Sequence, residues 1–261
     1  MHASALVTTL TAAIASVATF GTSLAQGAVT YRSKTCGQAA SGSITLATPA
    51  GTASGDVMVA SVAYAGVSGS TSAPSGWTQV PNLKASFGAN QELITYYRVL
   101  SAAPAANYTF TGGSGADVAS ASLASFRGVD TTSPIDGTPA QTIVSSLATS
   151  GNFPNSTGVA AGSMRYSAIG IDDGSTTTMG SGLTTLCVED NESGSDASIG
   201  TAYESTGVGT TATRGFTLDD NGHLGLQTFI LAPMPCAQGG LNLTAPSTVS
   251  FGSHTLTGSN G

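Results

Sequence analysis

Charge is the property this sequence has least of. Only 8% of its 261 residues are Asp, Glu, Lys or Arg, and seven basic against fourteen acidic residues give a net charge of −7. The basic residues form no cluster, so the chain offers no complementary surface to nucleic-acid phosphates or anionic lipid headgroups. We therefore expect no nucleic-acid partner.

The low charge does not indicate a disordered chain. Disordered segments combine high charge with low hydrophobicity, whereas 40% of these residues are hydrophobic. The hydrophobic residues fall in short runs of strand length, bounded by Gly, Pro, Ser, Asn and Asp. Outside the N-terminal segment there is no convincing amphipathic helix, and the pattern predicts an all-β protein.

Catalytic and metal-binding motifs are also scarce. The sequence has no G-x-S-x-G motif and no CxxC or CxxH spacing, and only His223 and His254 follow the N-terminal segment. Nucleophilic hydrolysis needs a general base beside its nucleophile, and that base is usually histidine. The expectation is a protein that is not an enzyme.

An internal repeat is the most informative feature that the sequence does have. Three residues of the first half recur 106 residues later: Trp77, Tyr97 and Phe110 as Leu183, Tyr203 and Phe216. Each half opens on an apolar strand, Gly55 to Tyr64 or Gly162 to Ile171, and closes on another. Two similar units in series predict a jelly-roll-like antiparallel β-sandwich built from two pseudo-repeated halves.

The segment between the two halves, Thr131 to Ala160, is rich in Ser, Thr, Pro and Asn. Ile143, Val144 and Leu147 form its apolar core, and we expect the segment to cross from one sheet to the other. The sandwich is assigned to residues 26–236.

Residues 1–25 predict a secretory signal peptide. Residues 3–25 are uncharged and mostly apolar, and end in the small-x-small cleavage pattern Ser23-Leu24-Ala25. Because a basic n-region is missing, a weak membrane anchor or an assembly helix is the alternative. The many Thr and Ser residues disfavour a permanent span. We predict a secreted or cell-surface protein with no membrane span in the mature chain.

Three cysteines fit an oxidising compartment but not a disulfide-rich scaffold. Cys36 follows the first predicted strand, Ala28 to Lys34, and Cys236 follows the last strand of the repeat, Leu224 to Leu231. The first and last strands of a closed sandwich often lie side by side. The prediction is a Cys36–Cys236 disulfide that leaves Cys187 free, and the alternative is three unpaired thiols.

The chain changes character after residue 236. Residues 237–261 read as a linker and the start of an incomplete following module, with strands expected at Leu241 to Ala245 and Thr248 to Phe251. These strands are too few to form a domain alone. An incomplete sheet edge can pair with a neighbour, so self-assembly through the C-terminal strand is a further expectation.

Short motifs follow one another in order along the first half: Pro49-Ala-Gly51, Gly55-Asp56, Pro74-Ser-Gly-Trp77, Tyr97-Arg98-Val99, Tyr108-Thr-Phe110, Arg127-Gly-Val-Asp130 and Pro134-Ile-Asp136. As an ordered set they resemble a β-sandwich module that recurs in large, often multidomain, secreted or cell-surface bacterial proteins. The resemblance covers residues 28–233 and implies fold and location, but no catalytic residues. The tail from Leu241 to Phe251 is similar to the opening of a surface domain related to WxL cell-wall modules, although it lacks the WxL tripeptide.

Aromatic residues supply the candidate ligand site. Trp77, the only tryptophan, follows a Pro-Ser-Gly turn, and Tyr64 and Tyr96 lie on predicted strands. Sugars stack their apolar faces on exposed rings, so these three residues are the candidate polysaccharide-binding residues. The repeat favours a different interpretation, in which Trp77 is a buried anchor, because Leu183 holds its place in the second half.

Acidic loops supply the candidate metal site. Three loops of the second half are acidic, and calcium takes several oxygen ligands that converge from loops. The candidate ligands are Asp172, Asp173, Asp219 and Asp220. No EF-hand or RTX spacing is present, so solvated turns are the default interpretation, and no other cofactor is expected.

Two functions therefore compete. The first is a non-enzymatic structural or adhesion module of an extracellular bacterial surface protein. The alternative is a carbohydrate-binding module, with calcium as an assisting ion. The expected partners are a polysaccharide or other surface proteins.

Overall fold

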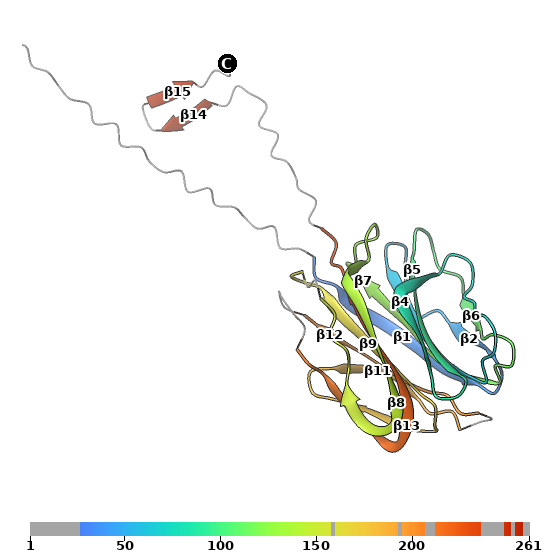
Figure 1. Ribbon diagram of the computed structural model, residues 1–261. Coiled ribbons are helices and arrows are strands. Elements are labelled where there is room, and N and C mark those ends of the chain that lie inside the picture. Colours follow the sequence, from blue (N-terminus) through green and yellow to red (C-terminus); the bar gives the residue numbers. More distant parts are fainter. Residues whose placement is uncertain are drawn as a thin grey trace, which may run out of the picture.

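The computed structural model describes residues 27–157, 160–192, 195–206, 212–235, 248–251 and 254–257. Every regular element in these ranges is a β-strand, and the described residues include no helix that could cross a membrane. The prediction of an antiparallel all-β sandwich built from two pseudo-repeated halves is confirmed (Figure 1).

The first half forms one five-stranded sheet, the N-terminal sheet, in the order β1-β7-β3-β5-β4. Its strands are β1 (Thr30–Ala39), β3 (Val57–Ala65), β4 (Thr78–Phe87), β5 (Gln91–Val99) and β7 (Val118–Arg127). Two further strands, β2 (Ser43–Ala47) and β6 (Asn107–Thr111), pair with each other in a small sheet of their own.

The second half repeats this plan in the C-terminal sheet, where the order β8-β13-β9-β12-β11 matches the five strands above one by one. These strands are β8 (Ile135–Asn152), β9 (Met164–Ile171), β11 (Thr184–Glu189), β12 (Ser198–Ser205) and β13 (Gly215–Leu231). The short β10 (Thr177–Met179) pairs with the start of β13, as Ser72 bridges Thr111 at the end of β6. Near the C-terminus, β14 (Thr248–Phe251) pairs with β15 (His254–Thr257).

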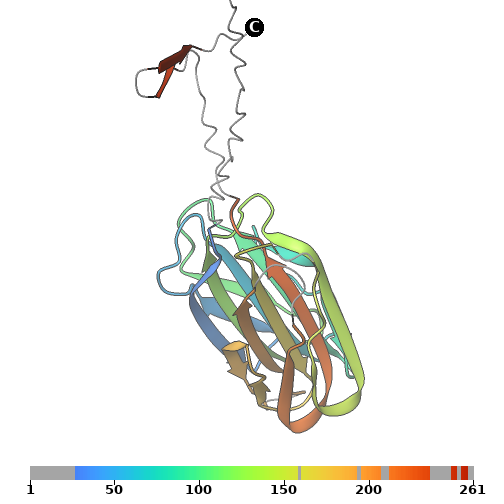
Figure 2. The same ribbon diagram turned by 90° about the vertical axis from the view of Figure 1, so that its left-hand side faces the viewer.

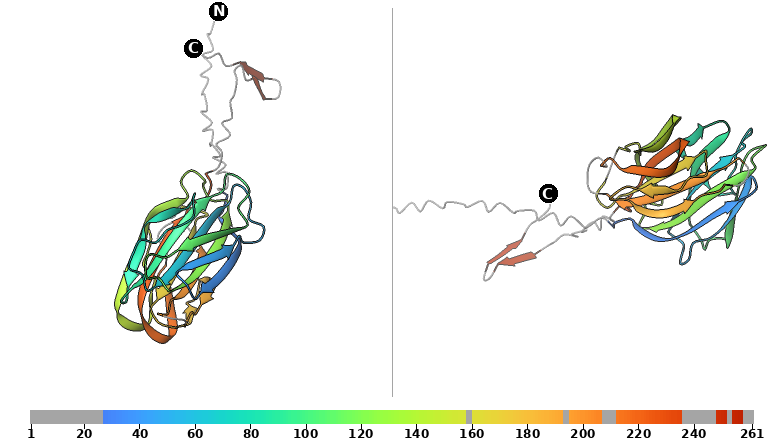
Figure 3. Two further views of the ribbon diagram at one scale, coloured as in Figure 1. Left: turned by 90° about the vertical axis from the view of Figure 1, so that its right-hand side faces the viewer. Right: turned by 90° about the horizontal axis from the view of Figure 1, so that it is seen from below.

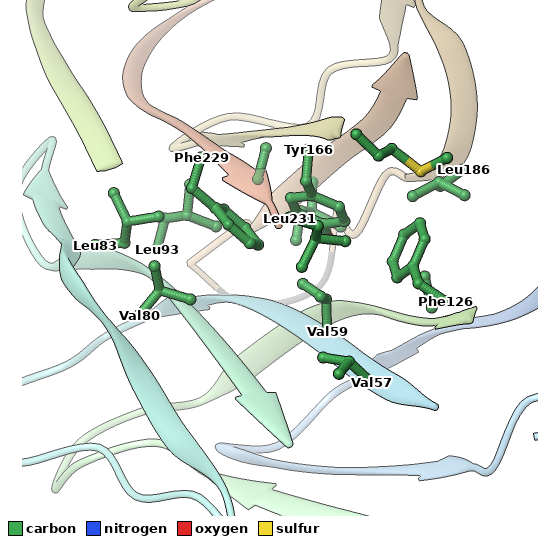
Figure 4. Packing of buried hydrophobic residues seen from close by; sticks show 14 of the residues in the cluster. Val57, Val59, Val80, Leu83, Leu93, Phe126, Tyr166, Leu186, Phe229 and Leu231 are labelled. Carbon is green, nitrogen blue, oxygen red and sulfur yellow. The ribbon is translucent and has the colours of Figure 1, made fainter. Parts of the chain in front are cut away.

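The two sheets pack face to face around a central core (Figure 2, Figure 3). Strand β3 shows that both faces of the N-terminal sheet are covered, since all nine of its residues are buried. Val57 and Val59 point toward the C-terminal sheet, and Met58 and Tyr64 point to the opposite side. The central core draws on both sheets (Figure 4): Val57, Val59, Leu93 and Phe126 from the first, and Tyr166, Leu186, Phe229 and Leu231 from the second.

Each sheet also has an outer core on the face that points away from its partner. The N-terminal outer core lies between the N-terminal sheet and the β2–β6 pair. The C-terminal outer core lies under the start of β13 and β10, and includes Phe216 and Leu224. The described residues of the sandwich therefore form three large apolar clusters in succession, and a small fourth cluster of Ala65, Val118 and Ala197.

A chain of buried polar groups crosses the central core. The Tyr166 hydroxyl donates to Ser61 Oγ at 3.0 Å, Ser61 Oγ lies 2.7 Å from Thr95 Oγ1, and Thr95 donates to Gln227 Oε1 at 2.7 Å. Gln227 Nε2 donates to the Leu93 carbonyl at 2.9 Å. Burial raises the pKa of Tyr166 to about 12. Since buried polar groups must be paired, this chain favours one alignment of the two sheets.

The disulfide prediction is wrong in its partner. Cys36 bonds to Cys187, with 5.8 Å between their Cα atoms. Strand β1 is an edge of the N-terminal sheet, and its neighbour across the sandwich is β11, an edge of the C-terminal sheet. The last strand of the repeat, β13, lies inside the C-terminal sheet between β8 and β9. It therefore does not lie beside β1, contrary to the prediction. Cys236 lies outside the described residues.

The segment between the halves also differs from its prediction. It does lead from one sheet to the other, but β8 is an edge strand whose neighbouring strand in the sheet is β13. Ile143 and Leu147 are therefore 46% and 61% exposed, and only Val144 packs against the C-terminal outer core. The sequence of this segment could not show which side of the strand would lack a neighbour.

The chain enters and leaves the sandwich at the same end. The Val29 amide donates to the Gly162 carbonyl and the Met234 amide donates to the Gly128 carbonyl, each at 2.8 Å. Ala28 packs directly on Gly128. Figure 1 and Figure 2 show the first and last coloured residues of the sandwich side by side. We call this the attachment end, and the opposite end of the sandwich the distal end.

Candidate functional site

The three candidate ligand-binding aromatic residues all pack in or against the N-terminal outer core. Tyr64 and Tyr96 are buried, and burial raises the pKa of both hydroxyls. Trp77 is half-buried, with its ring edge-on to those of Tyr108 and Phe110 at centroid distances of 5.3 and 5.2 Å. Neither tyrosine offers a ring face to a sugar.

The repeat explains the position of Trp77. Gly76 and Gly182 have φ angles of 83° and 86°, so a left-handed glycine precedes the anchor in each half. Leu183 packs against the C-terminal outer core as Trp77 packs against the N-terminal one. Trp77 is thus a packing anchor, which is the interpretation that the Trp-to-Leu exchange favoured.

The distal end gathers the three acidic loops of the second half and one aspartate of the first. Strands β9 and β11 end there while β7 and β12 begin there, because neighbouring strands are antiparallel. We call this group the acidic end, and it has nine members: Asp117, Asp172, Asp173, Glu189, Asp190, Glu192, Asp196, Asp219 and Asp220.

Asp196 shows how closely these carboxylates approach one another. Its pKa is raised, first by burial and then by the charges of Asp173, Asp190 and Asp117. Asp190 Oδ1 and Asp117 Oδ2 each accept a bond from a serine hydroxyl, at 3.0 and 2.7 Å. Among the described residues, no Lys or Arg forms a salt bridge with any member of the acidic end. The nine carboxylates of the distal end therefore have one ionic partner among the described residues, His223 beside Asp172.

Two of the four candidate calcium ligands are held by strong local hydrogen bonds. Asp172 accepts the His223 amide and lies against His223 Nδ1, both at 2.6 Å. Asp219 Oδ1 accepts the Thr176 amide at 2.7 Å and the Ser175 hydroxyl at 3.0 Å, and these bonds lower its pKa.

The other two candidates are engaged by the next residue along the chain. Asp173 Oδ1 accepts the amide of Gly174 at 2.9 Å, and Asp220 Oδ1 accepts that of Asn221 at 2.7 Å. Within the described ranges, no group of three or more His, Cys, Asp or Glu residues is arranged to hold a metal ion. Calcium takes six to eight converging oxygens, and a calcium site at these loops stays a prediction.

Sequence reasoning missed an ionic cluster in the second half. Arg165 is fully buried on the outer face of the C-terminal sheet, where its Nη1 lies 3.3 Å from Glu204 Oε1. Arg214 Nε lies 2.6 Å from the other oxygen of Glu204. Burial lowers the pKa of Arg165, the Glu204 carboxylate opposes that shift, and Arg214 adds to it. An arginine inside the apolar run Met164–Ile171 was the signal that could have revealed this cluster.

This ionic cluster is structural. Arg165 Nη1 donates to the Ala212 carbonyl at 2.8 Å, and Nη2 donates to the Pro154 carbonyl at 3.4 Å. Arg165 thereby ties two covering segments to the sheet, with its donors used inside the protein.

The described residues thus hold two contrasting ends, one where the chain attaches and one that is acidic. Neither a protein-family model, nor a curated protein, nor a solved structure matches this chain.

Proposed function

We propose that this chain is a non-enzymatic adhesion module of an extracellular bacterial surface protein, and that it presents the acidic end to a partner protein. One observation carries the proposal. The chain enters and leaves at the attachment end, with Val29 and Met234 bonded to neighbouring segments there.

The position of the two chain connections distinguishes a pendant module from a spacer. A module that extends a stalk passes the chain from one end to the other, so that its length adds to the stalk. Here both connections lie together and the long axis of the sandwich projects away from them (Figure 1). The distal end is the surface such a module would offer to a partner, because loops at the end of a rigid scaffold are common binding sites.

The negative charge of the acidic end indicates which class of partner it would bind. The acidic end has nine carboxylates, and no described Lys or Arg pairs with them. A basic protein surface would be attracted to it over a range set by ionic strength. We infer a protein partner with a Lys- or Arg-rich surface, and contact that weakens as salt rises.

Adhesion of the full chain to defined surfaces tests this proposal. Beads that carry the chain would flow over surfaces coated with polylysine, polyglutamate or a neutral polysaccharide, with calcium or with EDTA. We expect salt-sensitive retention on polylysine alone. Retention on the polysaccharide that EDTA abolishes would instead support the calcium-assisted carbohydrate-binding alternative, and no retention on any surface would contradict both.

Two matched variants locate the contact. Asp173→Asn with Asp190→Asn removes two charges from the acidic end, and Asp130→Asn with Asp136→Asn removes two near the attachment end. Retention should fall with the first pair and persist with the second. Equal losses would show that net charge alone is responsible, and the acidic end would not be the contact surface.

A further inference from the structure

We propose that the Cys36–Cys187 disulfide is a mechanical stop, which limits how much of the sandwich can be peeled open when the chain is pulled from its two ends. The inference depends on the proposed function only in that a surface module is expected to carry load. It depends on no ligand.

The entry strand and the exit strand are held very differently. Strand β1 is an edge strand that hydrogen-bonds only to β7. Strand β13 lies inside its sheet, where it pairs with both β8 and β9. Force applied at the attachment end acts on both strands at once, and the edge strand has half the backbone bonds to lose. Strand β1 is therefore where peeling begins.

The residues before Cys36 are held by contacts that can break one after another. Thr30 accepts a hydrogen bond from Arg127 Nε at 2.8 Å, and the Tyr31 ring stacks on that of Tyr203 at 5.0 Å. Arg32 pairs with the buried carboxylate of Asp56 at 2.8 Å. Each contact opens with the local ladder to β7, and none requires the rest of the sandwich to unfold.

The situation changes at Cys36. Its disulfide joins β1 to β11, which is an edge of the opposite sheet. Beyond it, Gln38 Nε2 donates to Glu189 Oε2 at 3.2 Å and to the Asp190 carbonyl at 3.1 Å. Cys187, the partner of Cys36 on β11, is buried, and β11 pairs with β12. Peeling past Cys36 must therefore pull β11 away from β12. Before Cys36, peeling of β1 breaks one contact after another. Beyond Cys36, further peeling breaks both sheets together.

The repeat supplies an internal control for this interpretation. Strand β8 is the counterpart of β1, the edge strand beside β13 as β1 is beside β7. Gln141 lies opposite Gln227 on β13, in the place that Cys36 takes opposite Ser122 on β7. The chain continues from β8 into the sandwich at both ends, so β8 cannot be peeled from a free end. The disulfide occurs only at the edge strand through which the chain enters the sandwich.

Pulling single molecules of the full chain by its two ends tests the proposal. In the oxidised protein we expect an early, reversible step on the order of 3 nm, which is the extended length of the eight residues before Cys36. Complete unfolding should follow as a separate event at higher force. In the Cys36→Ser, Cys187→Ser variant the early step should merge with unfolding, and the mean unfolding force should fall.

A second variant separates a stop from a general stabiliser. Leu226→Ala removes a buried side chain from the C-terminal outer core, far from β1 in the strand order. When this variant and the double variant have the same thermal midpoint, Leu226→Ala should keep the early step. It should also unfold at a higher force than the double variant. An equal loss of force in the two variants, or no early step in the oxidised protein, would overturn the proposal.

Two arrangements keep the outcome decisive. If the double variant does not fold, the oxidised protein can be pulled repeatedly before and after a reductant is added, and the early step should disappear as the bond is reduced. Retention on polylysine is a separate measurement. Loss of adhesion with an intact stop would contradict only the proposed function, and the reverse result would contradict only this inference.

Discussion

The outer faces of the two sheets have the same strand plan, but matching positions near the attachment end differ in chemistry. In the first half, Trp77 packs between Tyr108 and Phe110, and the Arg98 guanidinium lies 5.2 Å from the centre of the Tyr108 ring at the surface. In the second half, Arg165 is buried beneath the covering segments and neutralised by Glu204.

The difference can be followed position by position. Strand pairing places Met58 beside Arg98 in the first half, and Arg165 beside Glu204 in the second. The second half thus has an arginine where the first half has a methionine, and the acidic residue at the position of Arg98 compensates this buried cation. A repeated backbone therefore accepts either rings or ions, provided that the buried charge is paired.

Removing the compensating carboxylate should have the largest effect. Glu204→Ala leaves the Arg165 charge buried without a partner, and we expect a loss of about 3–5 kcal/mol in the free energy of unfolding. Arg98→Ala, at the matching position, removes only a surface contact with a ring and should cost about 1 kcal/mol or less. Chemical denaturation measures both, and equal losses would contradict the contrast between the halves.

Shortening the aromatic anchor should come next. Trp77→Ala empties part of the N-terminal outer core and should cost about 3 kcal/mol. Trp77→Leu, the exchange that the repeat itself contains, should cost about half as much. As the only tryptophan, Trp77 should also show a red shift in emission on unfolding. Unchanged stability in Trp77→Ala would show that its ring is not a packing anchor.

Converting the second half to apolar chemistry should have a smaller effect. Arg165→Met with Glu204→Met removes both buried charges, and buried ion pairs are often replaceable by apolar residues of similar volume. We expect stability within about 2 kcal/mol of the original, well above that of Glu204→Ala. A double variant as unstable as Glu204→Ala would mean that the bonds from Arg165 to the covering segments matter more than charge pairing.

The acidic end should give the smallest effects, with opposite signs. Hydrogen bonds lower the pKa of Asp219, so its stabilising effect is present above its ordinary pKa of 3.8 and is lost as pH falls further. The pKa of Asp196 is raised, so its charge opposes folding at neutral pH and its protonation relieves that cost as pH falls. At neutral pH, Asp219→Asn should lower the thermal midpoint slightly, and Asp196→Asn should raise it.

A thermal melt across a pH series checks both substitutions. The gain from Asp196→Asn should shrink on acidification, and so should the loss from Asp219→Asn. Midpoint shifts of the same sign would contradict the carboxylate repulsion inferred at the distal end.

Much of the fold followed from local patterns. The two predicted apolar segments, Gly55 to Tyr64 and Gly162 to Ile171, hold β3 apart from its last residue and the whole of β9. The turn at Gly55-Asp56 is equally local, because Asp56 Oδ2 accepts the Ala53 amide at 2.8 Å. These features depend on residues near one another in the chain, so a single sequence is sufficient.

The candidate sites were less predictable, because they depend on which face of a strand is covered. Tyr64 and Tyr96 alternate with other apolar residues on strands whose two faces are both buried, so their pattern could not distinguish a ligand surface from a second core. The partner of Cys36 depended on which edges of two different sheets meet. Neither relation is encoded at short range.

By itself, the sequence determined the all-β class, the two-fold repeat and the low charge of this protein. Strand periodicity, turn residues and a 106-residue spacing express local preferences that any compact arrangement has to satisfy. Only the tertiary structure decided that the rings face a core, that Cys36 meets Cys187, and that nine carboxylates gather at the end opposite the chain's entry and exit. Those outcomes depend on how two sheets stack and align, which is a matter of contacts between residues far apart in the chain.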